Sequence, residues 1–433
     1  MPSAPRERTG AIGDVTRRRA LALLAGTLAA GSGTGADAVG SGRRVTPRFR
    51  VRTLTAGVPL ERLDTPGPVA GALEFLASAR RRVVEAGYEV QTIRVTLNPL
   101  LRDATRAQRT AALPALHELD QLAADHGAML GIGPVFGRGA WDPSIAPWAV
   151  ELVAATRVTC FSVEVAGEND GPRDGAARVA GAVIAALAAA TADGSANFRF
   201  AAAASIPPGT PFFPVGYHDG EPSLAIGLES AGLVGEAFAG AADHVQATAR
   251  LQMIMNGALR PVEDLGRLIA AAAGRRYLGI DASPAPGVDC SIVRALEALA
   301  QQPFGAPSTL QSCSAVTAAL RALEVSTCGY SGLMLPVLED PVLAARAAEG
   351  RVTLSQLLLC SSVCGTGLDL VPLPGSVTAT ELARIVGDVA TLATRLRKPL
   401  SARLMPVIGK RAGDEVRLDD PRLCAARVLP PGG

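Results

Sequence analysis

Apolar runs with strand character alternate with longer amphipathic helical patterns from Phe49 to near the end of this chain. This alternation is typical of parallel strands that are joined by crossover helices. We predict strands at residues 49–54, 90–97, 129–135, 157–165, 198–203, 224–228, 277–282, 333–337, 368–373 and 401–408. Because about ten strands are many for a small open sheet, we expect an α/β fold of roughly ten mostly parallel strands that close into a barrel.

Helical patterns occupy the stretches between these strands and leave no clear linker. We predict helices at residues 69–86, 108–125, 176–192, 241–272 (one or two helices), 291–300, 314–323, 341–348, 353–363 and 378–396. The 46 glycines and 31 prolines are spread through the connections, and 48% of the 433 residues are apolar, which is enough for a packed core. We therefore expect residues 49–433 to form a single large α/β domain.

The first 48 residues differ from the rest in being rich in Gly, Ala and Arg. Thr16-Arg17-Arg18-Arg19 precedes an apolar stretch at residues 20–30, and Ala36-Asp37-Ala38 follows as a small-x-small cleavage pattern. This layout is typical of a twin-arginine export signal. The alternative is a disordered tail, translated from upstream of a wrongly assigned start codon. The first interpretation predicts an exported protein, and the second predicts a cytoplasmic one.

The balance of charged residues excludes some classes of partner. The chain has 42 basic and 40 acidic side chains, whereas a dedicated nucleic-acid-binding protein needs a basic surplus. No apolar run approaches the ~20 residues that a membrane span requires. The seven cysteines form neither a regular disulfide framework nor a CxxC pair, so we expect no disulfide-stapled scaffold and no structural zinc site.

Nearly all basic residues are arginines, and the only lysines are Lys398 and Lys410. A position that needs a compact ammonium group resists replacement by Arg, so we expect a functional role, such as anion binding, for at least one of these lysines. Arg52, Arg94 and Arg403 lie in or beside predicted strands, where a guanidinium group needs a carboxylate or phosphate partner. Internal ion pairs and bound anions would both meet that need.

A cysteine-containing turn at residues 363–369 separates a predicted helix from a predicted strand. Gly365 and Gly367 leave its backbone free to turn sharply and to bring amide groups close to a ligand. Cys364 would be a nucleophile at this turn if a nearby cation lowers the pKa of its thiol. In the alternative interpretation, the glycines only form the turn and Cys364 is a small buried hydrophobic side chain.

Three further residues are candidate proton carriers. Glu164 and Asp281 are carboxylates beside apolar strands, and His218 lies in a glycine-rich polar loop. We expect Glu164 and Asp281 to lie at the carboxyl ends of their strands, since parallel α/β folds bind ligands there. For His218, the alternative is a histidine in solvent with no chemical role.

An acidic loop after one strand offers oxygen ligands for a metal. With the polar loop around His218, it supplies Glu164, Glu168, Asn169, Asp170, His218, Asp219 and Glu221. Hard oxygen ligands of this kind suit Mg²⁺ or Mn²⁺. No spacing among them matches a known metal motif, so we predict a solvated acidic loop without a cofactor and keep Mg²⁺ or Mn²⁺ as the alternative.

Short segments spread over most of the chain form a recognisable series. They lie at residues 51–57, 87–94, 217–218, 281–286, 330–332, 336, 339–340, 364–369 and 398–414. In this order, they resemble domain-of-unknown-function family 711, and the resemblance spans residues 49–420. It implies a barrel like that of pyruvate formate-lyase and its glycyl-radical relatives. The Arg-Val-x-Gly-aromatic radical loop of those enzymes is missing, since the nearest segment, Thr327-Cys328-Gly329-Tyr330, lacks the Arg-Val pair.

The resemblance also implies a partner and supports certain residues. Family members look cytoplasmic and often occur beside a small ACT-type amino-acid-sensing protein, which implies a regulatory partner. Lys398 and Lys410 fall where the family also shows Lys, and Cys364 and Asp369 fall in its cysteine-containing turn.

These expectations combine into one functional hypothesis and one alternative. The hypothesis is an enzyme that acts on a small anionic metabolite at the mouth of the barrel, with Cys364 as nucleophile or acid–base group and with His218, Glu164 and Asp281 as proton carriers. The residues expected to bind the carboxylate or phosphate are Arg52, Arg94, Lys398, Arg403, Lys410, Gly365, Gly367 and Asp369. The alternative is a non-catalytic ligand-sensing protein that partners an ACT-type protein. A homo-oligomer is a further expectation.

Overall fold

The computed structural model describes residues 48–167 and 170–432 of the chain. Its central element is a ten-stranded sheet. The strands of this sheet are β1 (Arg50–Val58), β2 (Val90–Leu97), β3 (Ala128–Pro134), β4 (Thr159–Gly167), β5 (Gly171–Pro172), β6 (Phe200–Ala204), β7 (Ser223–Glu229), β8 (Arg276–Ala285), β9 (Gly367–Pro374) and β10 (Leu400–Val407). A separate two-stranded sheet pairs β11 (Glu415–Val416) with β12 (Ala426–Arg427).

The strands follow the order β8-β7-β1-β2-β3-β4-β6-β10-β9, with β5 beside β4. Strands β1, β2, β3, β4 and β6 are parallel to one another. The flanking pairs, β7 with β8 and β10 with β9, are each parallel internally but run antiparallel to the five central strands. The predicted α/β class with about ten mostly parallel strands is therefore confirmed.

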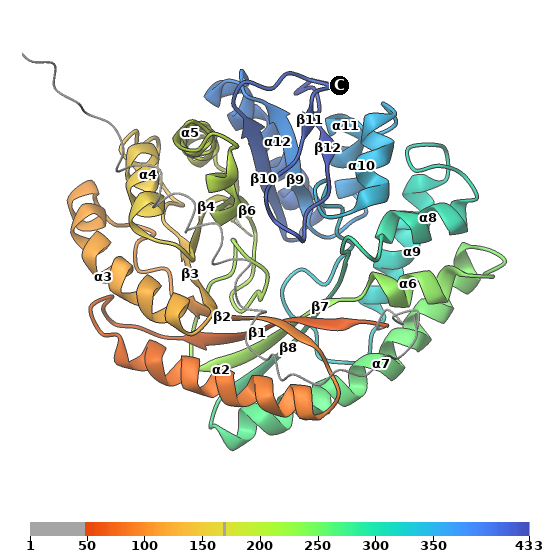
Figure 1. Cartoon of the computed structure of the whole chain (residues 1–433), viewed down its shortest axis with the longest axis horizontal. Helices are drawn as coiled ribbons and strands as arrows, with labels where there is room; N and C mark the ends of the chain where they lie inside the picture. Colours follow the sequence, from red (N-terminus) through yellow and green to blue (C-terminus); the bar gives the residue numbers. More distant parts are fainter. Residues whose placement is uncertain (1–47, 168–169, 433) are drawn as a thin grey trace, which may run out of the picture.

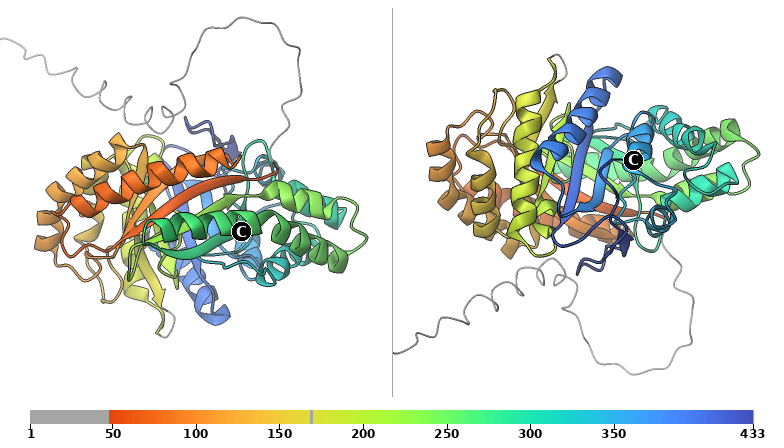
Figure 2. Two further views of the ribbon diagram at one scale, coloured as in Figure 1. Left: turned by 90° about the horizontal axis from the view of Figure 1, so that it is seen from below. Right: turned by 90° about the horizontal axis from the view of Figure 1, so that it is seen from above.

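Helices cover the outer face of the sheet, as Figure 1 shows. They are α2 (Gly67–Glu85), α3 (Arg106–Asp125), α4 (Ile145–Ala155), α5 (Asp174–Ala190), α6 (Ala231–Phe238), α7 (His244–Ala272), α8 (Ile292–Ala300), α9 (Thr309–Arg321), α10 (Pro341–Ala348), α11 (Leu354–Ser361), α12 (Ala379–Leu396) and the short 3₁₀ helix η2 (Ser195–Arg199). Each α-helix buries an apolar stripe, for example Leu73 of α2 and Val386 of α12. Helices α5 and α12 run side by side (Figure 2), and Gly181 permits this because a Cβ atom there would lie 2.4 Å from the carbonyl oxygen of Ala379.

The two outermost strands, β8 and β9, are connected through a third segment. Among the described residues, Thr327 forms a parallel bridge to Ile280 of β8, and Pro336 forms a parallel bridge to Asp369 of β9. The residues between Thr327 and Pro336 therefore cross from one edge of the sheet to the other. Because both bridges are isolated, closure into a barrel stays a prediction.

The connection between β6 and β7 packs on the inner face of the sheet, opposite to the helices. Its residues Ile206, Phe212 and Val215 form a buried cluster with Tyr330 and Met334. Its Pro211 carbonyl accepts hydrogen bonds from side chains of β1 and β2. The inward-facing polar side chains of these strands are therefore hydrogen-bonded to the backbone of this connection.

Some short elements differ from the sequence prediction. The sequence does not predict helices α4 and α6. Helix α4 is strongly apolar and therefore shows no amphipathic pattern, and α6 contains Gly232 and Gly235, which are typical of a loop. The strand predicted at residues 333–337 is wrong, since this buried stretch forms only the bridge at Pro336. In the part of the chain that the structure describes, no helix has the length and apolarity needed to cross a membrane. The expected export signal lies outside the described residues.

Candidate anion-binding site

A buried arginine with no acidic partner in residues 48–167 and 170–432 marks the candidate site. Arg94 lies in the middle of β2, and only 7% of its surface is exposed. Its Nη1 donates to the carbonyl of Pro211 at 3.0 Å, and its guanidinium group lies 5.0 Å from the centre of the Phe213 ring. Its buried Nε has no hydrogen-bond partner among the described residues. Buried polar groups are normally hydrogen-bonded, so this donor is available to an anion.

Arg403 and Asp369 form the second part of the site, on the paired strands β10 and β9. Arg403 Nη1 donates to Asp369 Oδ1 at 3.0 Å, while the buried Nε of Arg403 also finds no partner in the described part of the chain. Burial raises the pKa of the Asp369 carboxyl group, although the charge of Arg403 opposes this rise. The pair therefore offers a free N–H donor next to a carboxyl group that holds its proton more strongly than usual.

Arg52 connects this site to carboxylates near the start of β1. It forms ion pairs with Glu339 at 2.8 Å and with Glu229 at 3.3 Å. Arg422, in the segment between β11 and β12, pairs with Asp420 at 2.6 Å, and its charge acts on the pKa of Arg94. The Arg422 side chain is 49% exposed, so the network reaches the solvent at this point.

Positive charge is concentrated around Arg94. Burial and the neighbouring charges of Arg52, Arg422 and Arg403 lower the pKa of Arg94 to about 9, so it remains a cation at neutral pH. The other three guanidinium groups have carboxylate partners, which are Glu229, Glu339, Asp369 and Asp420. A carboxylate or phosphate bound at Arg94 would neutralise the one guanidinium of the four that lacks such a partner among the described residues.

His218 lies at the opposite end of the strands from Arg52. In the β1–β7 register, Gly57 faces Ser223 and Arg50 faces Glu229, which separates the two ends. The His218 side chain lies beside Gly57 and Ser223, and its Nε2 is 3.0 Å from the carbonyl oxygen of Gly220. Only 1% of His218 is exposed, so a histidine in solvent is the wrong alternative, and burial lowers its pKa, which favours the neutral ring.

Glu164 also lies toward that end, where arginines neutralise it. It pairs with Arg173 at 2.9 Å and with Arg102 at 3.8 Å. Beside it lies a cavity of about 10 Å³, lined also by Ser162, whose buried Oγ lacks a partner among the described residues. A cavity of this size and polarity suits one water molecule at most.

The metal alternative is not tested by the structure. Glu168 and Asn169, two of its expected ligands, lie outside the described residues. Within residues 48–167 and 170–432, no group of three or more His, Cys, Asp or Glu side chains is arranged to hold a metal ion. Asp170, a third expected ligand, pairs with Arg173 at 2.9 Å.

Asp281 of β8 is fully buried and anchors the segment that crosses between the sheet edges. Its carboxylate accepts hydrogen bonds from Ser283 Oγ (2.6 Å) and from the backbone N–H groups of Ser283, Tyr330 and Ser331 (3.1, 2.8 and 3.0 Å). Burial raises its pKa to about 6 despite these bonds. The geometry supports a structural role, and proton transfer by Asp281 stays a prediction.

Cys364 and Lys398 lie at the end of α11, and Gly365 packs against the backbone of Gly332 in the segment that crosses between the sheet edges. Cys364 belongs to the main hydrophobic core, and only 1% of its surface is exposed to solvent. This burial raises the pKa of its thiol. Lys398 Nζ donates to the carbonyls of Ser362 and Cys364, just past the last turn of α11, where a cation is favourable. This arrangement favours the interpretation of Cys364 as a small buried side chain, and a nucleophilic role stays a prediction.

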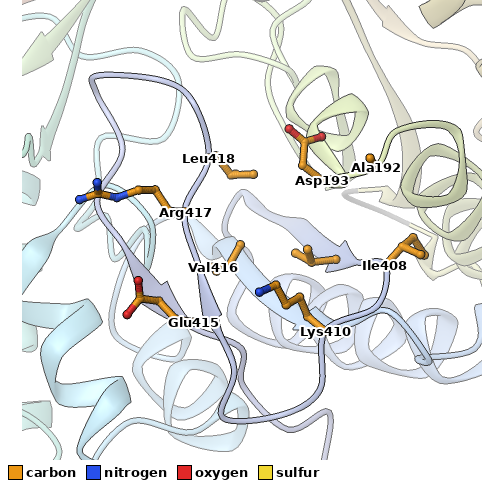
Figure 3. A pocket seen from close by; sticks show the side chains of 9 residues that line it. Ala192, Asp193, Ile408, Lys410, Glu415, Val416, Arg417 and Leu418 are labelled. Carbon is orange, nitrogen blue, oxygen red and sulfur yellow. The ribbon is translucent and has the colours of Figure 1, made fainter.

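Lys410 lies apart from the other candidates, beyond the end of β10. It lines a cavity of about 410 Å³ together with Asp193 and residues around β11 (Figure 3). None of the residues that line this cavity belongs to the network around Arg94. The structure thus brings together Arg52, Arg94, Arg403 and Asp369, and it places the other predicted site residues elsewhere.

Several residues of the network are absent from the sequence-based candidates. Glu229 is the last residue of the apolar strand β7, and it pairs with Arg52. A carboxylate beside an apolar strand is the same signal that makes Glu164 a candidate, so the sequence could have indicated Glu229 as well. Glu339 falls in one of the segments that carry the family resemblance. Cys160 of β4 is fully buried, its pKa is raised by burial to about 11, and the charges of Arg94 and Arg403 act on it. No sequence signal distinguishes Cys160 from an ordinary core cysteine.

Comparisons with known proteins give the family of the chain. A family model described as "Uncharacterised ACR (DUF711)" matches residues 46–419. A UPF0210 protein of Pyrobaculum arsenaticum is 32% identical over 378 residues, covering 81% of this chain and 82% of that protein. A UPF0210 protein of Desulforudis audaxviator is 30% identical over 398 residues, covering 84% of this chain and 87% of that protein. The chain therefore belongs to the DUF711 family, as the series of segments predicts.

Proposed function

We propose that this protein is an enzyme that acts on a small anionic metabolite, a carboxylate or a phosphate, bound between Arg94 and Arg403 on the inner face of the sheet. The observation that carries the proposal is the Nε–H group of Arg94, which is buried and lacks an acceptor among the described residues. A bound anion would accept this hydrogen bond and offset the mutual repulsion of Arg94, Arg52 and Arg403.

Asp369 is the acid–base group of this proposal. Its carboxyl group contacts Arg403, and burial raises its pKa, so it stays protonated to a higher pH than an ordinary aspartate. A proton donor beside a bound anion is the arrangement that general acid catalysis requires.

The proposal includes a closed barrel of the pyruvate formate-lyase kind. The segment that bridges β8 at Thr327 and β9 at Pro336 supports closure, since it spans the gap between the outermost strands. Closure would surround the site on the inner face and limit its access to the end where Arg422 reaches solvent.

A test of anion binding uses inorganic phosphate and succinate as probes. Arg94→Met is expected to weaken binding by about 10- to 100-fold, the usual value of a hydrogen bond to a charged group. In the absence of an anion, its melting temperature should equal or exceed that of the wild type, because an apolar side chain replaces a buried charge that has no carboxylate partner in the described part of the chain. Thermal unfolding with increasing phosphate or succinate measures both quantities.

Arg199→Met is the matched control for this test. Arg199 is a partly buried arginine, but its Nη1 and Nη2 atoms already donate to Thr156 and to the carbonyl of Val153. The control should lower the melting temperature and keep the rise that anions cause. An equal anion-dependent rise in Arg94→Met and wild type would overturn the proposed site.

Turnover distinguishes the enzyme from a ligand-sensing protein that partners an ACT-type regulator. The purified protein is incubated with a mixture of small carboxylates and phosphate esters, and their consumption is followed by mass spectrometry. We expect wild type to consume a compound that Asp369→Asn leaves intact, because the variant lacks the proton donor. Anion binding without consumption would support the sensing function instead.

A further inference from the structure

Helix α7 has an outer face that the rest of the described chain leaves uncovered. With 29 residues it is the longest helix that the structure describes, and it lies on the outside of the molecule (Figure 1 and Figure 2). Its inner side packs against α6, α9, β7 and β8. On its outer side, Met253 is 67% exposed and Leu268 is 58% exposed. Single exposed apolar side chains are common, so their neighbours on the helix decide whether this face is an interface.

The outer face of α7 is a stripe with helical spacing. Its residues follow one another at intervals of three or four, which places them above one another on one side of the helix. All of them are exposed except Arg250, which is half-buried. They are Gln246, Arg250, Met253, Gly257, Pro261, Asp264 and Leu268. We call this set the α7 stripe.

The chemistry of the α7 stripe is complementary about its centre, Gly257. Met253 and Pro261, which are both apolar, lie four residues before and four residues after this glycine. Arg250 and Asp264, which carry opposite charges, lie seven residues before and seven residues after it. When two copies of a helix cross antiparallel at one residue, a position before the crossing on one copy faces the position equally far after the crossing on the other. A second copy of α7 therefore matches the stripe in its apolar and in its charged pairs.

The two charges that would meet in this pairing lack ionic partners within the described chain. Arg250 Nη2 donates to the backbone carbonyl of Glu236 at 3.4 Å, and neither Arg250 nor Asp264 forms an ion pair among the described residues. The other two arginines of α7 are each paired with a glutamate of the same chain at 2.7 Å. These pairs are Arg260–Glu324 and Arg267–Glu263. The stripe thus keeps one cation and one anion available for a partner of the opposite pattern.

Gly257 suits a crossing point between two helices. A Cβ atom at this position would meet no atom within 4 Å, so packing within the described chain does not require a glycine. Because glycine in the interior of a helix is less favourable than alanine, its place at the centre of the exposed stripe needs another reason. Without a side chain at this position, the backbone of a second helix can approach closely.

We propose that the α7 stripe is the interface of a homodimer, in which two α7 helices cross antiparallel at Gly257. Arg250 of each copy pairs with Asp264 of the other, about 10 Å from the crossing along the helix axis. At a crossing angle of about 20°, the two axes are still close enough there for the long arginine side chain to span the gap. Met253 packs on Pro261 between the crossing and the ion pair. The two-fold axis makes each of these contacts occur twice.

The test measures the self-association of the full-length protein by analytical ultracentrifugation over a dilution series. We expect the wild type to form a dimer. In Arg250→Asp, both ion pairs become contacts between two carboxylates, so the dissociation constant of the dimer should rise about 10- to 100-fold. Asp264→Arg should weaken the dimer by a similar factor, because two guanidinium groups then face each other in both contacts.

Compensating variants test the pairing itself. The double variant Arg250→Asp/Asp264→Arg restores opposite charges in both contacts and should dimerise like the wild type. A mixture of the two single variants should form heterodimers, because each contact then joins one carboxylate to one guanidinium group. If the two side chains acted only within their own chain, mixing the single variants would restore nothing.

Arg384→Asp is the matched control, since Arg384 is an exposed arginine of α12 and lies outside the α7 stripe. This variant should keep the wild-type dissociation constant. A wild type that is monomeric at every concentration would assign the stripe to a different partner and overturn the proposal. A dimer that both single variants retain, or a failure of the double variant or of the mixture to dimerise, would overturn it as well. None of these outcomes depends on anion binding at Arg94, so the two proposals stand or fall separately.

Discussion

Replacement of Gly365 by alanine is expected to lower the free energy of unfolding by at least about 3 kcal/mol, the upper end of the usual cost of overpacking. Gly365 and Gly332 pass each other with their backbones in contact, so a Cβ atom on Gly365 would lie 2.1 Å from the Cα atom of Gly332. The three nearest atoms all belong to the Gly332 backbone, so no flexible side chain can move away. The two chain segments would have to separate, which would disturb the Gly332 N–H bond to Ser283 Oγ.

Urea denaturation, followed by circular dichroism, measures this loss. Gly387→Ala is the control, because a Cβ atom at that position in α12 meets no atom within 4 Å. The control should gain about 0.5–1 kcal/mol, since alanine is the better helix former. A Gly365→Ala protein that keeps wild-type stability but loses anion binding would instead support the ligand-approach role that the sequence suggests for this glycine.

Much of the fold could be predicted from local sequence patterns. The strand predicted at residues 90–97 coincides with β2, and the helix predicted at 378–396 coincides with α12, whose capping box of Thr378 and Glu381 marks its start. Prediction fails where burial replaces periodicity. Helix α4 buries Trp148 and Leu152 in an almost wholly apolar stretch, and residues 333–337 are apolar because they are buried rather than because they pair in a sheet.

The sequence predicted less well which residues share the site, because the direction of each strand decides at which edge of the sheet its residues lie. The sequence suggests that Glu164 and Asp281 lie at the same edge, as in an all-parallel sheet. Strand β8 instead runs antiparallel to β4, since the β1–β7 pairing reverses direction and β8 is parallel to β7. Such long-range pairing leaves no local signal. The three strand-borne arginines were nevertheless predicted, because a buried guanidinium needs a partner in any topology.

Asp281→Asn is expected to destabilise the protein by about 2 kcal/mol at pH 7, because the N–H of Tyr330 would then face an amide donor in place of Oδ2. The loss should be larger at lower pH. The pKa of Asp281 is about 6 in the folded protein, compared with an ordinary value of 3.8 for an aspartate that is exposed to solvent. Between pH 3.8 and pH 6, the folded state therefore binds more protons than the unfolded state. Stability from this carboxyl group is therefore present at low pH and disappears as the pH rises through about 6.

The measurement compares the unfolding free energies of wild type and Asp281→Asn between pH 4.5 and pH 7. The gap between the two proteins should be about 2 kcal/mol wider at pH 4.5 than at pH 7, because only the wild type carries the titrating carboxyl group. Other titrating groups contribute equally to both proteins and cancel. A gap that is constant with pH, or that widens as the pH rises, would mean that Asp281 stays ionised in the folded state and that its four hydrogen bonds outweigh its burial.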